Sequence, residues 1–348
     1  MPAPELTAAI CDINSVSGNE RELADAVEDA LSAVPHLRVS RNGDAVVART
    51  DLDRGERVVI AGHIDTVPVA GNLPTRRERD VLWGRGTVDM KGGVAVMLRL
   101  AASIVAPRRD VTYVFYDHEE VEAERNGLGR IAGAHPDWLA GDFAVLMEPT
   151  SAVVEGGCNG TMKATVTLHG TASHSARWWM GSNAIHAAAD VLERLRRYEP
   201  QVVEVDGLTY REGLNAVDIS GGIAGNVIPD RCVVGVNYRF APNRSEADAE
   251  AHVREVFDGF DVAVADSAPG ARPGLNAAAA ASFVTAIGGT PRAKEGWTDV
   301  SRFTALGTPA VNYGPGDPLL AHHDEERVDI GEIVLCEDRM RAWLTGAD

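Results

Sequence analysis

The sequence predicts an α/β domain that is interrupted by a smaller α+β domain. In the first part, short apolar runs bounded by turn residues alternate with a longer apolar stretch, which is typical of strands and helices layered on one sheet. In the middle, the runs change to alternating apolar and polar residues, the pattern of antiparallel strands with one wet face. After a linker-like run rich in Pro and Gly at 269–274, the first pattern resumes.

The elements of the first part follow in order along the chain. A helix is predicted from Glu20 onward, because apolar residues recur there at spacings of three and four. The stretch 92–106 predicts a helix that packs on the sheet. Short runs containing valine or tyrosine predict strands buried on both faces, at 57–61, 111–116 and 143–147.

The middle part predicts strands and helices of another kind. Alternating runs at 162–169 and 232–240 predict antiparallel strands, and amphipathic helices are expected at 184–197 and 246–257. An alanine-rich helix and the apolar run 309–313 then return to the first pattern. We therefore divide the chain into a first α/β part, an insert and a second α/β part, at 1–158, 159–272 and 273–348.

Composition and charge exclude several classes of protein. The chain has 348 residues, of which 45% are apolar and 24% charged, so it can bury a large core. A formal net charge of −18 argues against binding of nucleic acid or of an anionic membrane. No apolar run is long enough to span a bilayer, and no secretory signal is visible. The four cysteines are scattered, which argues against disulfides or a thiolate zinc site and favours the cytoplasm.

Polar clusters follow the predicted strands. Ligand and catalytic groups in α/β sheets tend to lie just beyond the carboxyl ends of strands. Here, such groups follow each of the predicted strands 57–61, 111–116 and 143–147. Two further clusters lie just before the helix predicted at 92–106 and after the apolar run 309–313. The candidate side chains in these clusters are His63, Asp65, Asp89, Glu119, Glu120, Glu148 and His322.

Two histidines and several carboxylates without a thiolate form a ligand set that suits zinc, and a shared carboxylate suits a site with two metal ions about 3.5–4 Å apart. Asp65 can orient the imidazole of His63 by contacting the ring without binding the metal itself. Adjacent Glu119 and Glu120 point in different directions, so that one can bind metal while the other takes a proton from water.

Each cluster alone has a plainer interpretation. A His-x-Asp sequence is commonly an ordinary hydrogen-bonded pair, and a Glu-Glu pair is commonly solvated surface. The glycine-rich run 84–93 could cradle phosphate, but it lacks the Walker spacing and Asp89 would repel phosphate. Five such clusters in succession make the metal site the better interpretation.

At these residues the chain resembles the co-catalytic zinc aminoacylase/carboxypeptidase family. The similarity covers essentially the whole chain, and its motifs are GHIDTVP (62–68), GRGTVDMKGG (84–93), EE (119–120), GTASHSA (170–176) and GNVIPD (225–230). The resemblance implies a zinc-peptidase-like α/β catalytic domain with a mixed sheet and flanking helices. It also implies that the insert is a ferredoxin-like α+β dimerisation domain, so that a homodimer is expected.

The resemblance also implies the role of each candidate residue. His63 and Glu148 would bind one divalent ion and Glu120 and His322 the other, with Asp89 between them; zinc is expected, and cobalt can substitute. Glu119 would be the general base. His323 is adjacent to His322 and is the alternative ligand at that position.

Residues of the insert would complete the site. His174 resembles the histidine that crosses the dimer interface to stabilise a tetrahedral oxyanion, and Arg239 resembles the arginine that grips a substrate carboxylate. Further substrate contacts are expected from Asn226, Arg177 and Thr298.

The expected reaction is metal-assisted hydrolysis of an amide in a small molecule. The stretch YDHEEVEAERNGLG (116–129) favours the branch of the family that hydrolyses N-succinyl-L,L-2,6-diaminopimelate, an intermediate of lysine biosynthesis, and Glu148 favours an acylated amino acid over a peptide. Acetylornithine deacetylases, aminoacylases, dipeptidases and carboxypeptidases use the same kind of site and remain alternatives. A binding homologue that has lost catalysis is a more remote one.

Overall fold

The computed structural model describes residues 1–346, which form two compact units. Unit 1 contains residues 1–156, 273–292 and the chain from 299 onward, whereas unit 2 contains 157–272 and 293–298. The segment 293–298 therefore belongs to unit 2 with the insert, although the chain has already returned to unit 1 at residue 273. Among the described residues, no helix is long and apolar enough to cross a membrane.

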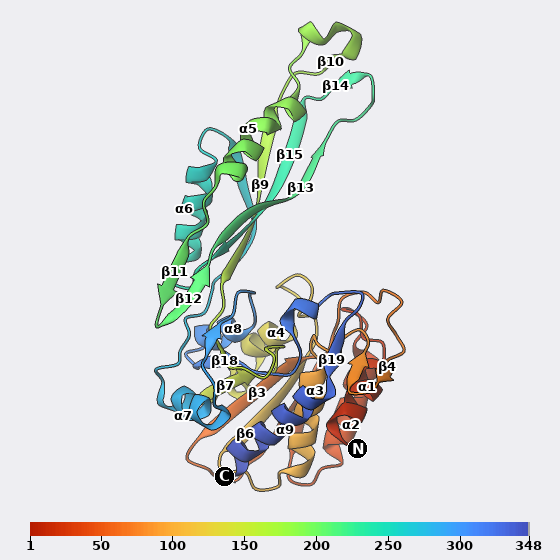
Figure 1. The fold of residues 1–348 in the computed structure, drawn as a ribbon, viewed down its shortest axis with the longest axis vertical. Coiled ribbons are helices and arrows are strands. Elements are labelled where there is room, and N and C mark those ends of the chain that lie inside the picture. Colours follow the sequence, from red (N-terminus) through yellow and green to blue (C-terminus); the bar gives the residue numbers. More distant parts are fainter. Residues whose placement is uncertain (347–348) are drawn as a thin grey trace. The chain divides into compact units, whose positions relative to one another are not determined.

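Unit 1 is built on a mixed sheet (Figure 1). Strands β6, β3, β7 and β18 are parallel to one another, and the flanking β2 and β8 are antiparallel to their neighbours. In the described residues the order is β1 (Arg38–Asn42), β2 (Ala45–Arg49), β6 (Asp110–Tyr116), β3 (Arg57–His63), β7 (Phe143–Leu146), β18 (Ala310–Asn312), β8 (Glu155–Gly156) and β17 (Arg292–Ala293).

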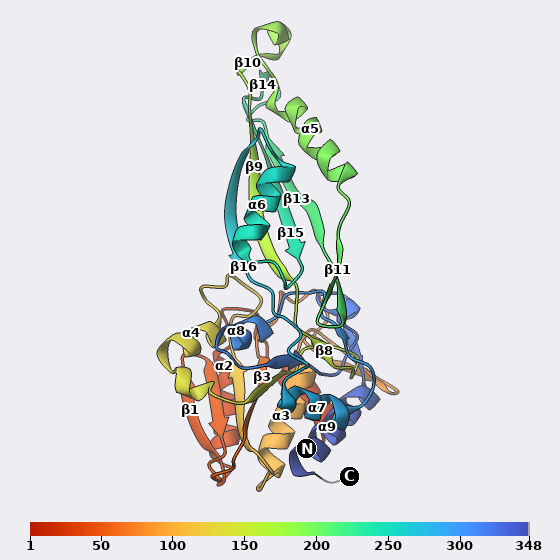
Figure 2. The ribbon, with the colours of Figure 1, turned by 90° about the vertical axis from the view of Figure 1, so that its left-hand side faces the viewer.

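Helices cover both faces of this sheet. Figure 2 shows α3 (Lys91–Ser103), α7 (Ala278–Ile287) and α9 (Ile330–Thr345) on one side, and α4 (Gly127–Ala134) and α8 (Val300–Ala305) on the other. Because both faces are covered, all residues of β6 and β7 are buried, as their apolar composition predicts. The remaining elements of unit 1 are α1 (Ala3–Cys11), α2 (Arg21–Ser32), η1 (Pro136–Trp138), η3 (Pro318–Leu320) and a small sheet of β19 (Arg327–Asp329), β5 (Val81–Trp83) and β4 (Arg76–Glu78).

Unit 2 contains a four-stranded antiparallel sheet with two helices. The elements follow one another as β9 (Gly160–His169), α5 (Ala184–Arg197), β13 (Gly213–Gly221), β15 (Arg231–Phe240), α6 (Glu246–Val256) and β16 (Asp261–Ala268). The strands lie in the order β13-β15-β9-β16, which with this succession is a ferredoxin-like arrangement. Side chains alternate between buried and more exposed along β9 and β15, because α5 and α6 cover one face only.

Local sequence signals explain where the two helices of unit 2 begin. The side chain of Asn183 accepts hydrogen bonds from the first turn of α5, and Ser245 and Asp248 form a reciprocal capping box at the start of α6. Two small two-stranded sheets complete the unit. One is the hairpin of β11 (Val202–Val205) with β12 (Leu208–Arg211), and the other pairs β10 (Ser173–His174) with β14 (Val227–Ile228). The turn η2 (Ser175–Met180) follows β10.

The predicted fold class, an α/β domain with a mixed sheet interrupted by an α+β domain, is confirmed. The predicted strands at 57–61 and 111–116 correspond to β3 and β6, and the predicted helix at 184–197 coincides with α5. Helices α1 and α9 and strands β1 and β2 were not predicted. Each unit has its own buried apolar cluster.

Candidate metal centre

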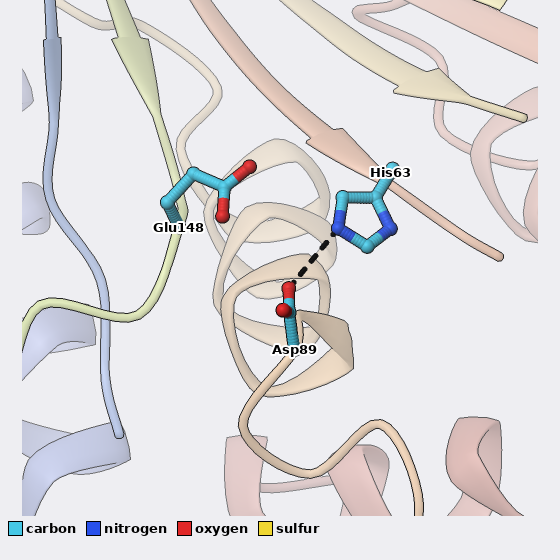
Figure 3. Close-up of side chains that lie close together, drawn as sticks. All are labelled: His63, Asp89 and Glu148. Atoms are coloured by element: carbon cyan, nitrogen blue, oxygen red, sulfur yellow. Dashed lines mark hydrogen bonds and ion pairs between the residues drawn. The ribbon is translucent and has the colours of Figure 1, made fainter. Parts of the chain in front are cut away.

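Six side chains gather at the carboxyl ends of the parallel strands of unit 1. His63 is the last residue of β3, Glu148 lies just after β7, and Glu119 and Glu120 follow β6. Asp89 precedes α3, and His322 lies after η3. Figure 3 shows Glu148, Asp89 and His63 converging from three separate segments of the chain.

The ligand atoms form three overlapping groups. His63 with Asp89 and Glu148, His63 with Glu119 and Glu120, and Asp89 with Glu120 and His322 each place three donor atoms within 4.8 Å of one another. The first and third groups share only Asp89. That is the arrangement a bridging carboxylate between two metal ions requires.

His63 is oriented through both of its ring nitrogens. Its Nδ1 lies 3.0 Å from the backbone carbonyl oxygen of Asp65, and its Nε2 lies 3.1 Å from Asp89 Oδ1. If Nδ1 donates to the carbonyl, Nε2 presents its lone pair to the cluster, as a metal ligand must. The Asp65 carboxylate is farther from the ring, with Oδ1 3.6 Å from Nδ1.

The Asp65 carboxylate also holds the loop after β6. Its Oδ1 accepts a hydrogen bond from the backbone N–H of Glu119 at 3.0 Å, and its Oδ2 accepts one from that of Glu120 at 3.1 Å. Asp65 therefore contacts the imidazole through its backbone oxygen and, at a longer distance, through its carboxylate, and the same carboxylate also holds the loop.

His322, rather than His323, reaches the cluster. The Nε2 atom of His322 lies 2.9 Å from Glu120 Oε1 and 3.3 Å from Asp89 Oδ2. His323 Nδ1 accepts a hydrogen bond from the backbone of Glu325 at 3.1 Å. The geometry therefore favours His322 between the two adjacent histidines.

The electrostatics of the cluster favour added positive charge. Burial raises the pKa of Glu119 well above its ordinary value, and the neighbouring carboxylates of Glu148 and Asp299 raise it further against the opposing effect of His63. Burial also raises the pKa of Glu120. Hydrogen bonding to Asp89 and to Glu120 raises the pKa of His322 to about 10. Buried carboxylates that lie close together repel one another, so a nearby positive charge stabilises them. Such a group of side chains is suited to bind metal cations.

Glu326 and Arg85 fix the backbone that carries Asp89. Glu326 is 1% exposed, and its Oε1 accepts hydrogen bonds from the N–H groups of Val88 at 2.9 Å and Asp89 at 3.1 Å. Its Oε2 lies 2.9 Å from the guanidinium of Arg85. Neither role was predicted from the sequence. The available signal was the spacing of four residues between His322 and Glu326.

Comparison with known proteins identifies the family. Residues 59–345 match Peptidase family M20/M25/M40. The chain belongs to this family. It is 56% identical over 345 residues, covering 98% of both chains, to the "Putative succinyl-diaminopimelate desuccinylase DapE" of Mycobacterium tuberculosis. It is 46% identical to the succinyl-diaminopimelate desuccinylase of Corynebacterium glutamicum, covering 98% of this chain and 95% of that one. A tripeptidase of Staphylococcus aureus has the same fold, with a TM-score of 0.80, 20% identity and coverage of 99% and 97%.

Three candidate residues of this M20 family member lie around the two-stranded sheet of β10 and β14 in unit 2. His174 pairs with Val227 across β10 and β14, and the carbonyl oxygen of Asn226 accepts a hydrogen bond from the N–H of Ser175 at 2.9 Å. Arg177 lies in η2, with φ −129° and ψ 47°. His174, Asn226 and Arg177 are all exposed.

The other two candidates of unit 2 lie elsewhere in it. Arg239 is in β15, paired with Gly213 and Thr161, and its Nε donates to Asn237 Oδ1 at 3.1 Å. Burial lowers the pKa of Arg239. Thr298 is buried in the segment 293–298, where its carbonyl oxygen lies 3.6 Å from the Cys158 sulfur.

Proposed function

We propose that this chain hydrolyses N-succinyl-L,L-2,6-diaminopimelate to succinate and L,L-2,6-diaminopimelate, a step toward lysine. The observation that carries the proposal is identity of 56% and 46%, over nearly the full length, to two proteins named as succinyl-diaminopimelate desuccinylases. The six clustered donor side chains of unit 1 supply the chemistry that such a hydrolysis needs.

Two divalent ions, with zinc as the native metal and cobalt able to substitute, fit the donor set of unit 1. Imidazole nitrogens and carboxylate oxygens, without thiolate, suit zinc in a hydrolytic site. His63 and Glu148 would hold one ion, Glu120 and His322 the other, and Asp89 both. Such ions polarise a carbonyl group and lower the pKa of water toward 7.

Glu119 is the general base in this proposal. Its carboxylate takes a proton from the attacking water and later gives it to the amine nitrogen that leaves. A carboxyl group whose pKa is raised by burial is suited to carry a proton near neutral pH, and Glu119 has such surroundings. Asp65 acts by holding the backbone of Glu119 and the ring of His63 in place.

His174 would donate a hydrogen bond to the oxyanion of the tetrahedral intermediate. Its Nδ1 accepts a hydrogen bond from the N–H of Ala176 at 3.1 Å, so the proton of the neutral ring is on Nε2, which can then act as the donor. Arg239 would bind a substrate carboxylate, with Asn226, Arg177 and Thr298 as further substrate contacts.

The proposed assembly is a homodimer formed through unit 2. Strand β13 is at one edge of its sheet, and its Val217 and Ile219 are 67% and 50% exposed. Strand β13 also carries one exposed carboxylate, Asp218, whereas the opposite edge strand, β16, carries two, Asp261 and Asp266, and charged side chains discourage pairing at an edge. The less charged β13 edge therefore suits a second copy of this chain better. The four free cysteines agree with a cytoplasmic location.

A substrate panel tests the activity. The purified protein with added zinc is assayed with N-succinyl-L,L-diaminopimelate, N-acetylornithine, other N-acyl amino acids and dipeptides. We expect kcat/KM to be highest for the succinyl compound, with succinate and diaminopimelate formed in equal amounts. A higher kcat/KM for another substrate assigns that activity instead, and no turnover together with retained ligand binding would indicate a binding homologue.

A further inference from the structure

The backbone just before Glu119 has an uncommon conformation. His118 has φ +58°, in the left-handed region that non-glycine residues adopt only uncommonly, although histidine is among those that adopt it more often. Such a conformation persists only where surrounding contacts hold it. The position of the Glu119 carboxylate therefore depends on the groups that hold this loop.

One of these groups is the Asp65 carboxylate, which is fully buried. It accepts hydrogen bonds from the N–H groups of both Glu119 and Glu120. The orientation of this one carboxylate therefore determines where the backbone of both glutamates lies, and with it where their side chains point. A rotation of the Asp65 side chain would move both.

Ser17 fixes that plane. Its hydroxyl donates to Asp65 Oδ2 at 2.6 Å, a short hydrogen bond to a charged acceptor. Ser17 itself is held against the end of β3, because its N–H donates to the Thr66 carbonyl at 3.1 Å and the Thr66 N–H donates to the Ser15 carbonyl at 3.1 Å. The hydroxyl thus has a fixed position.

The same N-terminal segment contacts the loop at a second point. Glu20 is fully buried, and its Oε1 accepts hydrogen bonds from the N–H of Gly18 at 2.8 Å and of His118 at 3.3 Å. Glu20 therefore holds the left-handed residue itself, and Ser17, through Asp65, holds the two residues that follow it. This segment lies outside the part of the chain that matches the family, 59–345.

We propose that Ser17 is a positioning residue for the general base Glu119, acting through Asp65. The proposal rests on the proposed function, in which Glu119 transfers the proton. Its hydroxyl fixes the Asp65 carboxylate, and that carboxylate fixes the two backbone N–H groups of the loop. Ser17 touches neither substrate nor metal in this role.

The test compares three variants. Ser17→Ala removes the hydroxyl, and Ser17→Thr retains it. Thr7→Val removes another buried hydroxyl of the N-terminal segment, one that donates to the Ala3 carbonyl within α1, and so matches the loss of a hydrogen bond without touching the loop. Each protein is assayed with zinc for kcat and KM, analysed for bound zinc, and examined without metal by amide hydrogen exchange in the peptide that contains Glu119 and Glu120.

For Ser17→Ala we expect kcat to fall by about tenfold, which is the low end of the effect of losing a group that holds a metal-site residue in place. KM should be nearly unchanged, and two zinc ions should still be bound. Exchange at Glu119 and Glu120 should be faster than in the wild type. Ser17→Thr should restore both properties, and Thr7→Val should change neither.

Unchanged exchange in Ser17→Ala, or an equal loss of kcat in Thr7→Val, would overturn the positioning role. A fall in bound zinc in Ser17→Ala would overturn it as well, because the residue would then act on the metal ligands. If the wild-type protein hydrolyses none of the substrates, the proposed function fails. The exchange measurement without metal still decides whether Ser17 holds the loop.

Discussion

Glu119 and Glu120 are adjacent, yet the fold gives them different surroundings. Glu120 Oε1 lies 2.9 Å from His322 Nε2 and belongs to the same group of donors as Asp89. Burial and the neighbouring carboxylates raise the pKa of Glu119 further above its ordinary value. The fold thus supports one glutamate as a ligand and the other as a proton carrier.

Replacing Glu119 by glutamine should abolish most turnover but leave the metal in place. Glu119→Gln keeps the size of the side chain and removes its ability to accept the proton, so we expect kcat to fall by about 10²- to 10⁴-fold. Metal analysis should still find two ions per chain. Turnover at nearly the wild-type rate would refute the assignment of the base.

Arg85→Met should destabilise the protein strongly. Arg85 and Glu326 are 3% and 1% exposed, and the variant leaves the Glu326 carboxylate buried without its cation. We expect the free energy of unfolding, measured by denaturant titration, to fall by about 3–5 kcal/mol.

The matched control is Arg77→Met, which removes a half-exposed partner of Glu5. It should change the free energy of unfolding by no more than about 0.5 kcal/mol. Similar losses of unfolding free energy in the two variants would show that the buried Arg85–Glu326 pair contributes no more to stability than an exposed pair.

The sequence predicts the residues of the metal site better than it predicts the residues that hold them in place. His63, Asp89 and Glu148 could be found because each follows a strand or lies in a long motif. Ser17 carries no such signal, and the spacing of Glu326 from His322 does not show what Glu326 contacts. Each acts on a residue far away in the chain: Ser17 on Asp65, 48 residues on, and Glu326 on Asp89, 237 residues back. Only the folded chain brings these partners together.

At the scale of elements, strands buried on both faces were the easiest to predict. Strands β3, β6 and β7 are almost continuously apolar, so their composition alone indicates burial. Two-residue strands such as β8 have no pattern of their own, since only the neighbouring strand makes them part of a sheet. Helix α9 was not predicted but does carry a signal, because its buried residues Ile333, Cys336 and Met340 have helical spacing.

The β13 edge provides a prediction at this scale. Ile219→Lys places a charge on the strand that we propose to pair with a second copy, so we expect the variant to sediment as a monomer. Val202→Lys is the control, because Val202 is also exposed in unit 2 but lies in the β11–β12 hairpin.

Analytical ultracentrifugation distinguishes the outcomes. A dimer in both variants, or a monomeric wild type, would contradict the proposed interface. If His174 acts across that interface, the monomeric variant should also lose most of its activity, and full activity in a verified monomer would exclude this role.

At the scale of the whole molecule, the net charge of −18 argues against binding of nucleic acid or of an anionic membrane. The proposed substrate carries three carboxylates and one ammonium group, so the distant field of the protein repels it. Two divalent ions would bring four positive charges against the carboxylates of Asp89, Glu120 and Glu148. Charges more than about 8 Å apart are largely screened at physiological ionic strength, so that nearby cations would bind the substrate carboxylates, the role that we propose for Arg239.

The most direct test of the account is a zinc titration of the metal-free protein. The initial rate of hydrolysis of N-succinyl-L,L-diaminopimelate and the amount of bound zinc are measured on the same samples. We predict no turnover without metal and a rate that reaches its maximum when two zinc ions are bound per chain. Turnover that persists after complete removal of metal, or none with both ions bound, would contradict the account.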